Sequence, residues 1–209
     1  YGSPSLEELC AGKKDIVIIS SDHTRPVPSR VTMPILLHHI HSAAPEARVR
    51  ILVATGMHRP STHEELVNKY GEEIVANEEI VMHVATDDSM MKKIGTLPSG
   101  GECIINKIAA DCDLLLAEGF IEPHFFAGFS GSRKSVLPGI ASYKTIMYNH
   151  NGQFVNDSHS RAGNLCHNHV SEDMFAAAEM AHLAFVLNVV LNGKHEVIGS
   201  FAGDIHKAH

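Results

Sequence analysis

Three apolar stretches, each followed at once by polar residues, restrict what this 209-residue chain can fold into. They cover residues 15–20 (D-I-V-I-I-S), 48–54 (R-V-R-I-L-V-A) and 114–117 (L-L-L-A). Short apolar runs that alternate with helix-like segments are typical of buried parallel strands. The pattern therefore predicts an α/β fold with a Rossmann-like, open, largely parallel sheet and helices on both of its faces.

The remaining segments fit this plan. A further strand is expected at residues 79–84, and residues 184–191 and 195–201 are expected to form a C-terminal hairpin. Asn192-Gly193 between them is a dipeptide typical of tight hairpin turns. Residues 95–101 and 151–169 are interpreted as irregular connections. Helices are expected over residues 3–12, 32–42, 104–110, 143–150, and from a cap at Ser171 to about residue 182.

Composition excludes several classes of function. With 44% hydrophobic and 20% charged residues, a chain of this length can bury a full core. The net charge of −7 provides no basic footprint, so neither nucleic acid nor an anionic membrane surface is an expected partner. The four cysteines show no C-x-x-C spacing, and no signal peptide or membrane-spanning run is present. These features favour a cytoplasmic protein with structural thiols.

Residues 118–140 bring reactive side chains together directly after the third strand. The stretch reads E-G-F-I-E-P-H-F-F-A-G-F-S-G-S-R-K-S-V-L-P-G-I and lacks the spacing of a Walker loop. Glycines permit close backbone approach, hydroxyls and backbone N–H groups could meet an anion, and a basic pair would supply the counter-charge. A phosphate site and an ordinary glycine-rich turn remain open alternatives, and His124 favours a reactive site. The residues concerned are Gly128, Gly131, Ser130, Ser132, Arg133 and Lys134.

Polar side chains also follow the first two strands. Asp22, Thr24 and Arg25 come after the first, and His58 lies between the end of the second strand and the start of the next helix. Open α/β sheets bind ligands at the carboxyl ends of their strands, so we expect these residues to meet the 118–140 loop at one rim. The alternative is that Asp22 only caps the following helix. Convergence of His, Arg and Lys from three loops favours an enzyme.

Four segments together resemble one family, the nickel-pincer lactate racemases and related 2-hydroxyacid racemases and epimerases. The segments are residues 21–28 (S-D-H-T-R-P-V-P), 54–60 (A-T-G-M-H-R-P), 119–140 and the pair Asn149-His150. Their order and intervals fit the N-terminal half of that family, and the resemblance covers nearly the whole chain. Ser132 and Met57 depart from the family's usual residues.

The resemblance implies a cofactor and the residues that hold it. The cofactor is a nickel-pincer nucleotide, a pyridinium-3,5-bisthiocarboxylate mononucleotide nickel complex tethered to a lysine. Proteins that synthesise this cofactor are then implied as partners, while the oligomeric state stays open. The motif match assigns the covalent link to Lys134, the nickel ligand to His150, and cofactor contacts to Asp22, His23, Thr24 and Arg25.

The resemblance also implies a reaction, the racemisation or epimerisation of a small 2-hydroxy acid such as lactate. His58 or His124 would take the hydroxyl proton while the α-hydrogen moves as hydride to the cofactor. The resulting 2-keto acid would take hydride back on its other face. Two histidines suit this chemistry because their ordinary pKa lies near neutrality.

Residues 1–209 are expected to form an N-terminal, cofactor-binding α/β domain. By the resemblance it lacks the family's first strands and the C-terminal domain that binds the substrate carboxylate, so it would be inactive alone. Two alternatives remain open. One is a non-catalytic domain that binds a nucleotide or metal. The other is a metal-dependent hydrolase built on His58, His124 and His150, although no H-E-x-x-H motif is present.

Overall fold

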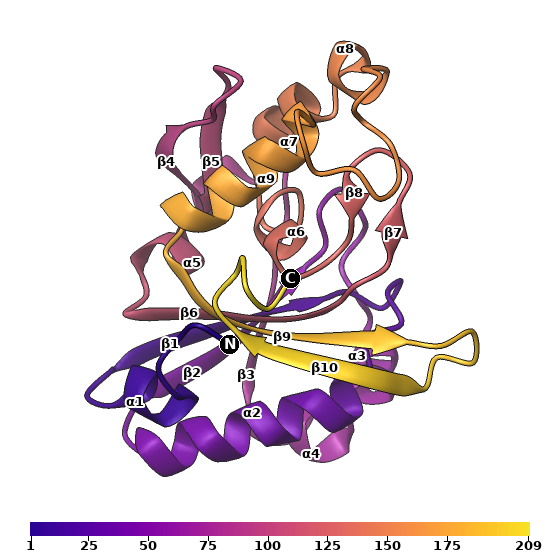
Figure 1. Ribbon diagram of the computed structural model, residues 1–209. Helices are drawn as coiled ribbons and strands as arrows, with labels where there is room; N and C mark the ends of the chain where they lie inside the picture. Colours follow the sequence, from indigo (N-terminus) through magenta and orange to yellow (C-terminus); the bar gives the residue numbers. More distant parts are fainter.

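The computed structural model describes all 209 residues and is built around a six-stranded sheet (Figure 1). The strand order is β10-β9-β6-β1-β2-β3, in which β10 alone is antiparallel to its neighbour. The predicted Rossmann-like, largely parallel sheet with a C-terminal hairpin is confirmed. The strands are β1 (Asp15–Ser21), β2 (Arg48–Ala54), β3 (Glu79–Met82), β6 (Leu114–Phe120), β9 (Leu183–Leu191) and β10 (Val197–Gly203).

Helices cover both faces of this sheet (Figure 1). One face carries α1 (Leu6–Cys10), α2 (Ser29–Ala43), α3 (His63–Tyr70) and α4 (Glu72–Asn77). The other carries α5 (Lys107–Asp111), α6 (Arg133–Val136), α7 (Tyr143–Asn149), α8 (Gly152–Val155) and α9 (His169–Met180).

The central strand β1 explains why its sequence is apolar without interruption. Successive side chains of a strand point to opposite faces of the sheet. Ile16 and Ile18 therefore join a buried cluster with α2, while Val17 and Ile19 join a second cluster with α9. Because both faces are covered, every position in the middle of the strand is buried.

The position of β1 also fixes where a ligand can bind. β1 pairs with β2 on one side and with β6 on the other, so the chain reverses its direction of travel across the sheet at this strand. Loops that leave a parallel sheet at such a switch point diverge and leave a crevice outside the carboxyl ends of the strands. The loops after β1, β2 and β6 border this crevice.

One prediction was wrong between β3 and β6. β4 (Met91–Thr96) and β5 (Glu102–Asn106) form a separate antiparallel sheet where a turn-rich connection and a helix over residues 104–110 were expected. Cys103 and Ile105 alternate into the core, which is the period of a strand. The helix α5 begins only after Asn106, whose side chain accepts a hydrogen bond from the N–H of Ile108.

Two details after residue 150 also differ from the prediction. The segment expected to be irregular contains the short helix α8. The cap of α9 is Asn168, and Ser171 donates its backbone N–H to the Asn168 side chain at 3.1 Å. Asn168 is therefore the cap, and the expected cap Ser171 lies in the first turn of the helix.

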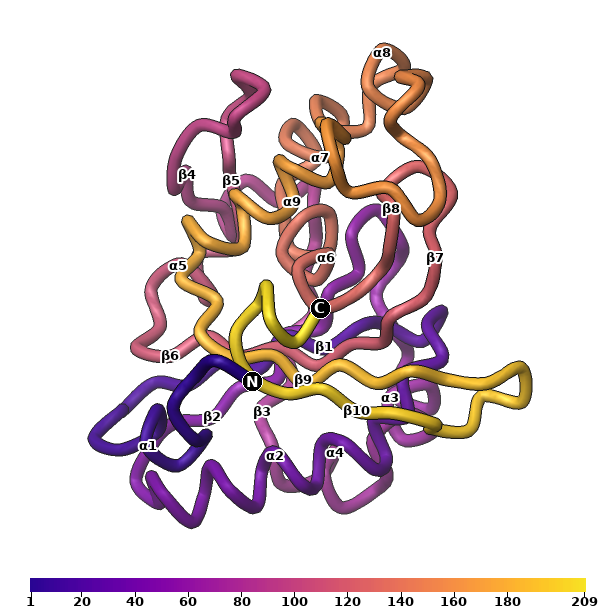
Figure 2. The backbone as a smooth tube through the Cα atoms, in the orientation of Figure 1, coloured from indigo at the N-terminus to yellow at the C-terminus, as the bar shows by residue number.

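The two ends of the chain lie beside the sheet and close to each other (Figure 2). The ammonium group of Tyr1 donates to the carbonyl of Ala202 at 2.6 Å, and the N–H of Asp204 donates to the carbonyl of Tyr1 at 2.9 Å. None of the helices combines the length and the apolar character needed to cross a membrane.

Candidate functional site

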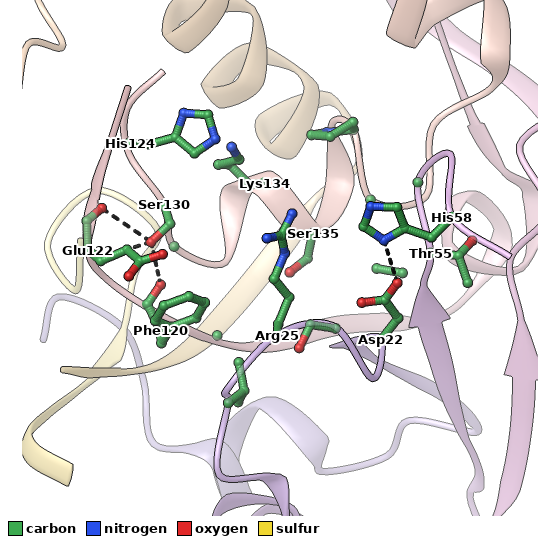
Figure 3. A pocket seen from close by; sticks show the side chains of 18 of the residues that line it. Asp22, Arg25, Thr55, His58, Phe120, Glu122, His124, Ser130, Lys134 and Ser135 are labelled. Carbon is green, nitrogen blue, oxygen red and sulfur yellow. Dashed lines mark hydrogen bonds and ion pairs between the residues drawn. The ribbon is translucent and has the colours of Figure 1, made fainter. Parts of the chain in front are cut away.

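A cavity of about 460 Å³ lies at the switch point of the sheet. Its walls come from the loops after β1, β2 and β6, with a contribution from the end of α7. The predicted convergence of three strand ends on one rim is therefore confirmed. Figure 3 shows His58 and His124 on opposite sides of this cavity, with the guanidinium group of Arg25 between them.

Six of the eight predicted site residues line the cavity, and two do not. His23 turns away from it, with Nδ1 2.9 Å from the hydroxyl of Ser61 and Nε2 3.5 Å from the carboxylate of Glu65. Thr24 instead bonds to its neighbour Asp22. The six residues on the cavity are Asp22, Arg25, His58, His124, Lys134 and His150.

A buried carboxylate orients His58. Nδ1 of His58 lies 2.6 Å from Oδ2 of Asp22, which is 1% exposed. The backbone N–H and the hydroxyl of Thr24 donate to the other oxygen, Oδ1, at 3.1 and 2.6 Å. Burial acts against ionisation, but the bonds from Thr24 and His58 outweigh it and lower the pKa of the Asp22 carboxyl. His58 itself reaches the cavity with 44% of its side chain exposed.

The opposite side of the cavity carries three nitrogen groups that form no ion pair. Burial lowers the pKa of His124 to about 3, helped by the charges of Lys134 and Arg25. Burial likewise lowers the pKa of His150 to about 4 and that of Lys134 to about 7. Desolvation disfavours a positive charge, so both imidazoles are neutral at neutral pH and the amine is partly unprotonated.

Aromatic rings and one backbone group hold His124 in place. The N–H of Ala127 donates to Nδ1 of His124 at 3.2 Å. The imidazole stacks on Phe125 with ring centres 4.6 Å apart and meets the edge of Phe126. Phe126 also meets His150 at 5.2 Å, so one ring separates and supports both imidazoles.

Arg133 does not face the cavity, and its predicted role as counter-charge for an anion is wrong. Its side chain is 1% exposed and donates to the carbonyl oxygens of Ser130, Ala127 and Phe129 at 2.8, 3.2 and 3.0 Å. The guanidinium is therefore used to satisfy buried carbonyls of the loop, and it also lies against Nε2 of His209 and the hydroxyl of Ser171. Lys134, one residue further on, faces the cavity instead.

The serines of the loop are also engaged internally. The hydroxyl and N–H of Ser132 donate to Oδ1 of Asn188 on β9 at 2.7 and 3.0 Å, so the predicted anion contact at Ser132 is wrong. The hydroxyl of Ser130 donates to the carbonyl of Phe120 at 2.9 Å. Between the short strands β7 (Pro123–His124) and β8 (Gly128–Phe129) the chain turns back, and Gly128 has φ +77°. A Cβ there would lie 2.4 Å from the carbonyl oxygen of Asn164.

Glu118 is a site residue that the sequence reasoning missed. It is fully buried at the floor of the cavity and accepts hydrogen bonds from the hydroxyls of Ser20, Ser29 and Thr32. These hydroxyls come from both ends of the loop over residues 21–28, so one carboxylate fixes that loop at its start and its finish. The available signal was a glutamate inside an apolar strand, since a buried acid requires partners.

The donor atoms around the cavity fit a covalently held cofactor better than a metal held by side chains alone. No three His, Cys, Asp or Glu side chains are close enough together to hold a metal ion. His150 lines the cavity and its Nδ1 is buried without a hydrogen-bond partner, so its imidazole can serve as a single metal ligand. The Lys134 amine and the Arg25 guanidinium form no side-chain hydrogen bond or ion pair, which leaves them available for a covalent link and for an anionic group.

Comparison with known proteins agrees with this geometry. The profile of the lactate racemase N-terminal domain family matches residues 1–163. The chain belongs to this family. It is 70% identical over 208 residues to the lactate racemase of Lactiplantibacillus plantarum and 53% identical to that of Thermoanaerobacterium thermosaccharolyticum. The resemblance drawn from four motifs is thereby confirmed.

Solved structures extend the agreement to the fold of this lactate racemase family member. The lactate racemase apoprotein from T. thermosaccharolyticum superposes with a TM-score of 0.98 at 53% identity, over 100% of this chain and 50% of that one. A Thermotoga maritima protein shares the fold with a TM-score of 0.76 at 22% identity, over 94% of this chain and 52% of that one. The chain spans about half the length of the curated relatives it matches, 49% in each case.

Proposed function

We propose that residues 1–209 form the cofactor-carrying domain of a racemase that acts on lactate or another small 2-hydroxy acid. Two curated relatives are named lactate racemase, which supports the reaction class. The observation that carries the cofactor assignment is the Lys134 amine. It has a pKa of about 7, forms no ion pair, and shares a cavity with His150, whose Nδ1 is buried without a hydrogen-bond partner.

In this proposal Lys134 forms the covalent link to a nickel-pincer nucleotide. An amine that is partly unprotonated at neutral pH is a nucleophile, and an ordinary lysine is not. His150 supplies an imidazole nitrogen, a ligand type that suits nickel. When bound, the cofactor supplies a site that accepts and returns hydride. Arg25 has the free guanidinium for its phosphate or for a developing alkoxide, since the oxygens of Asp22 are already engaged.

The two cavity histidines handle the proton. His58 and His124 approach from opposite sides of the cavity, with Arg25 between them (Figure 3). A 2-hydroxy acid that loses hydride and a hydroxyl proton becomes a flat 2-keto acid, and racemisation requires that it be reduced again on the other face. Proton-transferring groups on two sides match that requirement.

The alternative of a metal-dependent hydrolase is less well supported. It requires three protein ligands around one metal, and His58, His124 and His150 do not form such a group.

The alternative of a non-catalytic domain concerns residues 1–209 acting alone. Arg59, the other arginine near the rim, is paired with both oxygens of Glu65 at 2.6 and 2.8 Å, so Arg25 is the one free guanidinium available for the cofactor and for a substrate carboxylate.

We therefore propose that residues 1–209 alone turn over little substrate, even when loaded. Fixing a small substrate is worth about 7–11 kcal/mol of the barrier, and one arginine cannot serve two anionic groups. A chain extended to the length of the curated relatives is expected to racemise lactate, and the comparison of the two chains tests this. A cytoplasmic location and the cofactor-synthesis proteins as partners stay predictions.

The decisive experiment is mass spectrometry of the chain after co-expression with cofactor-synthesis proteins. A mass increment is expected on the peptide that contains Lys134, and none on protein expressed alone. Lys134→Arg keeps the positive charge without a nucleophilic amine, so it should lose the increment, whereas Lys144→Arg on the surface should keep it. An increment on another lysine would refute the assignment.

A further inference from the structure

His58 and His124, two of the three histidines that line the cavity, are both hydrogen-bonded through the ring nitrogen Nδ1, but to groups of opposite kind. Nδ1 of His58 faces a carboxylate oxygen of Asp22 at 2.6 Å. Nδ1 of His124 faces the backbone N–H of Ala127 at 3.2 Å. A neutral imidazole has one protonated and one bare nitrogen, so the group opposite Nδ1 decides the state of Nε2.

On the His58 side, the nearest partner can only accept. The Thr24 hydroxyl also lies 3.5 Å from Nδ1, but it gives its one proton to Oδ1 of Asp22. Asp22 is buried, and both protons that reach Oδ1 come from Thr24, which leaves Oδ2 to the imidazole. The hydrogen bonds from Thr24 and His58 lower the pKa of this carboxyl, so it is ionised at neutral pH. An ionised carboxylate has no proton to donate, so Nδ1 of His58 carries the proton and Nε2 is bare.

On the His124 side, the partner can only donate. A backbone N–H cannot accept a hydrogen bond, so Nδ1 of His124 must offer its lone pair to Ala127. The neutral ring then carries its proton on Nε2. The stacked Phe125 and the edge of Phe126 restrict rotation of this ring, which keeps Nδ1 directed at the backbone.

We propose that Asp22 is a positioning residue that holds His58 as the resting base of the cavity, while His124 presents an N–H. The tautomers follow from hydrogen bonding alone, and only their use in catalysis rests on the proposed function. Of the two histidines on opposite sides of Arg25, only His58 then offers a bare nitrogen, Nε2, to a hydroxy acid that enters the cavity. This gives Asp22 a role through His58, and its contact with the cofactor stays a prediction.

The proton balance of this arrangement is simple. The O–H bond of the substrate hydroxyl breaks, a new N–H bond forms at Nε2 of His58, and the imidazolium is stabilised by the Asp22 carboxylate. In this step, which starts from the resting tautomers, His124 donates a hydrogen bond to a substrate oxygen and keeps its proton. To act as a base at Nε2, His124 would first have to move its proton to Nδ1 and give up the bond from Ala127.

The tautomers can be read directly from the imidazole nitrogens of the ¹⁵N-labelled chain, without cofactor or turnover. Long-range proton–nitrogen correlation spectra distinguish a protonated ring nitrogen from a bare one. His58→Gln and His124→Gln variants assign the two rings among the 16 histidines. At neutral pH, His58 is expected to show a protonated Nδ1 and a bare Nε2, and His124 is expected to show the reverse.

Asp22→Asn is the sharpest variant because it keeps the shape of the side chain. Thr24 donates twice to Oδ1, so the amide oxygen stays on that side and the NH₂ group turns toward His58. The NH₂ group donates to Nδ1, and the tautomer of His58 is expected to invert. Asp157→Asn is the matched control, since Asp157 accepts from Nδ1 of the exposed His159 at 2.9 Å and should leave His58 unchanged.

Three outcomes would overturn the inference. They are a proton on Nε2 of His58 in the unaltered chain, a proton on Nδ1 of His124, or an unchanged His58 signal in Asp22→Asn. The first two need no variant of Asp22, so a failure of Asp22→Asn to fold would not protect the inference. If the tautomers are as stated but the extended, loaded chain does not racemise 2-hydroxy acids, then the proposed function fails and the positioning by Asp22 stands.

Discussion

The two sides of the cavity place histidines in opposite electrostatic surroundings. On the side of His58, a buried carboxylate accepts its N–H, and hydrogen bonds from His58 and Thr24 lower the pKa of that carboxyl. On the side of His124, no carboxylate forms an ion pair, and burial lowers the pKa of His124, His150 and Lys134. One side is suited to receive a proton. The other keeps its nitrogens uncharged, which suits a covalent bond and a metal.

The uncharged side depends on the way the loop after β6 is built. Arg133 is buried at the base of this loop without an acidic partner, and burial lowers its pKa to about 10. Its charge is the second cause of the lowered pKa of Lys134 after burial. The same guanidinium therefore holds the loop together and makes protonation of the neighbouring amine less favourable.

The largest expected effect concerns the proton-handling pair. In a loaded chain extended to the length of the relatives, His58→Gln and His124→Gln should each lower the racemisation rate about 10²–10⁴-fold. Both variants should keep the cofactor mass on Lys134, because the proposal assigns the covalent link to Lys134 alone. Racemisation assays combined with intact-mass measurement check this expectation.

His150→Gln provides the contrast within the same experiment. It should lower the nickel content while the covalent mass increment remains, since the proposal makes His150 a metal ligand and not a proton carrier. Metal analysis of the three variants separates the two roles. Full nickel content in His150→Gln, or normal turnover in either of the other variants, would remove the corresponding assignment.

The next prediction concerns Arg133, which holds the loop after β6 together. Arg133→Met removes a donor from three loop carbonyls, of which those of Ala127 and Ser130 keep a second partner in the N–H of Phe129 and in Nε2 of His209. A buried polar group that loses its partner costs about 1–3 kcal/mol, so we expect the free energy of unfolding in urea to fall by an amount in that range. Arg161→Met, at an exposed position, is the control. Equal stability of the two variants would mean that the loop does not depend on the guanidinium.

The sheet and the convergence of its loops could be predicted because both depend on local pattern. The bounds of β2 match the prediction, and β1 extends only one residue further. Polar residues at strand ends predicted the rim because parallel strands place their carboxyl ends on one edge of the sheet. The β4–β5 ladder was missed because its residues, M-K-K-I-G-T and E-C-I-I-N, lack a long apolar run.

The directions of side chains inside the loop could not be predicted in the same way. Ser132 is engaged by Asn188, a residue of β9 that only the folded sheet brings near. The pKa of Lys134 depends on which charges surround it in space, and sequence proximity to Arg133 suggested a shared anion site instead. His23 shows the same limit, since its neighbours in the motif face the cavity while its own ring meets Ser61.

A smaller effect should appear in the dependence of stability on pH. The pKa of His124 is about 3 and that of His150 about 4 in the folded chain, against an ordinary value of 6.5. The unfolded chain therefore binds more protons below about pH 6.5, and the free energy of unfolding falls as the pH drops. Urea unfolding at pH 7.5 and at pH 5 measures this loss.

Replacing both imidazoles shows how much of the loss of unfolding free energy at low pH is due to His124 and His150. In the double variant His124→Gln, His150→Gln, the difference in unfolding free energy between the two pH values should shrink. His83, with a pKa of about 4 under burial, contributes to the same loss and stays in place as an internal reference. An undiminished difference would mean that the two cavity imidazoles are protonated in the folded chain as readily as in the unfolded one.

The smallest expected effect concerns Phe125, an exposed ring on the His124 side of the cavity. Phe125 is 76% exposed. Its ring stacks on His124 with ring centres 4.6 Å apart and meets the edge of Phe126. Substitutions at exposed positions usually change stability by no more than about 0.5 kcal/mol, so Phe125→Ala should be nearly neutral in urea unfolding. Met57→Ala, at a position 50% exposed on the other side of the cavity, is the matched control. A loss above about 1 kcal/mol for Phe125→Ala alone would mean that the stack on His124, besides restricting the rotation of that ring, contributes to the stability of the fold.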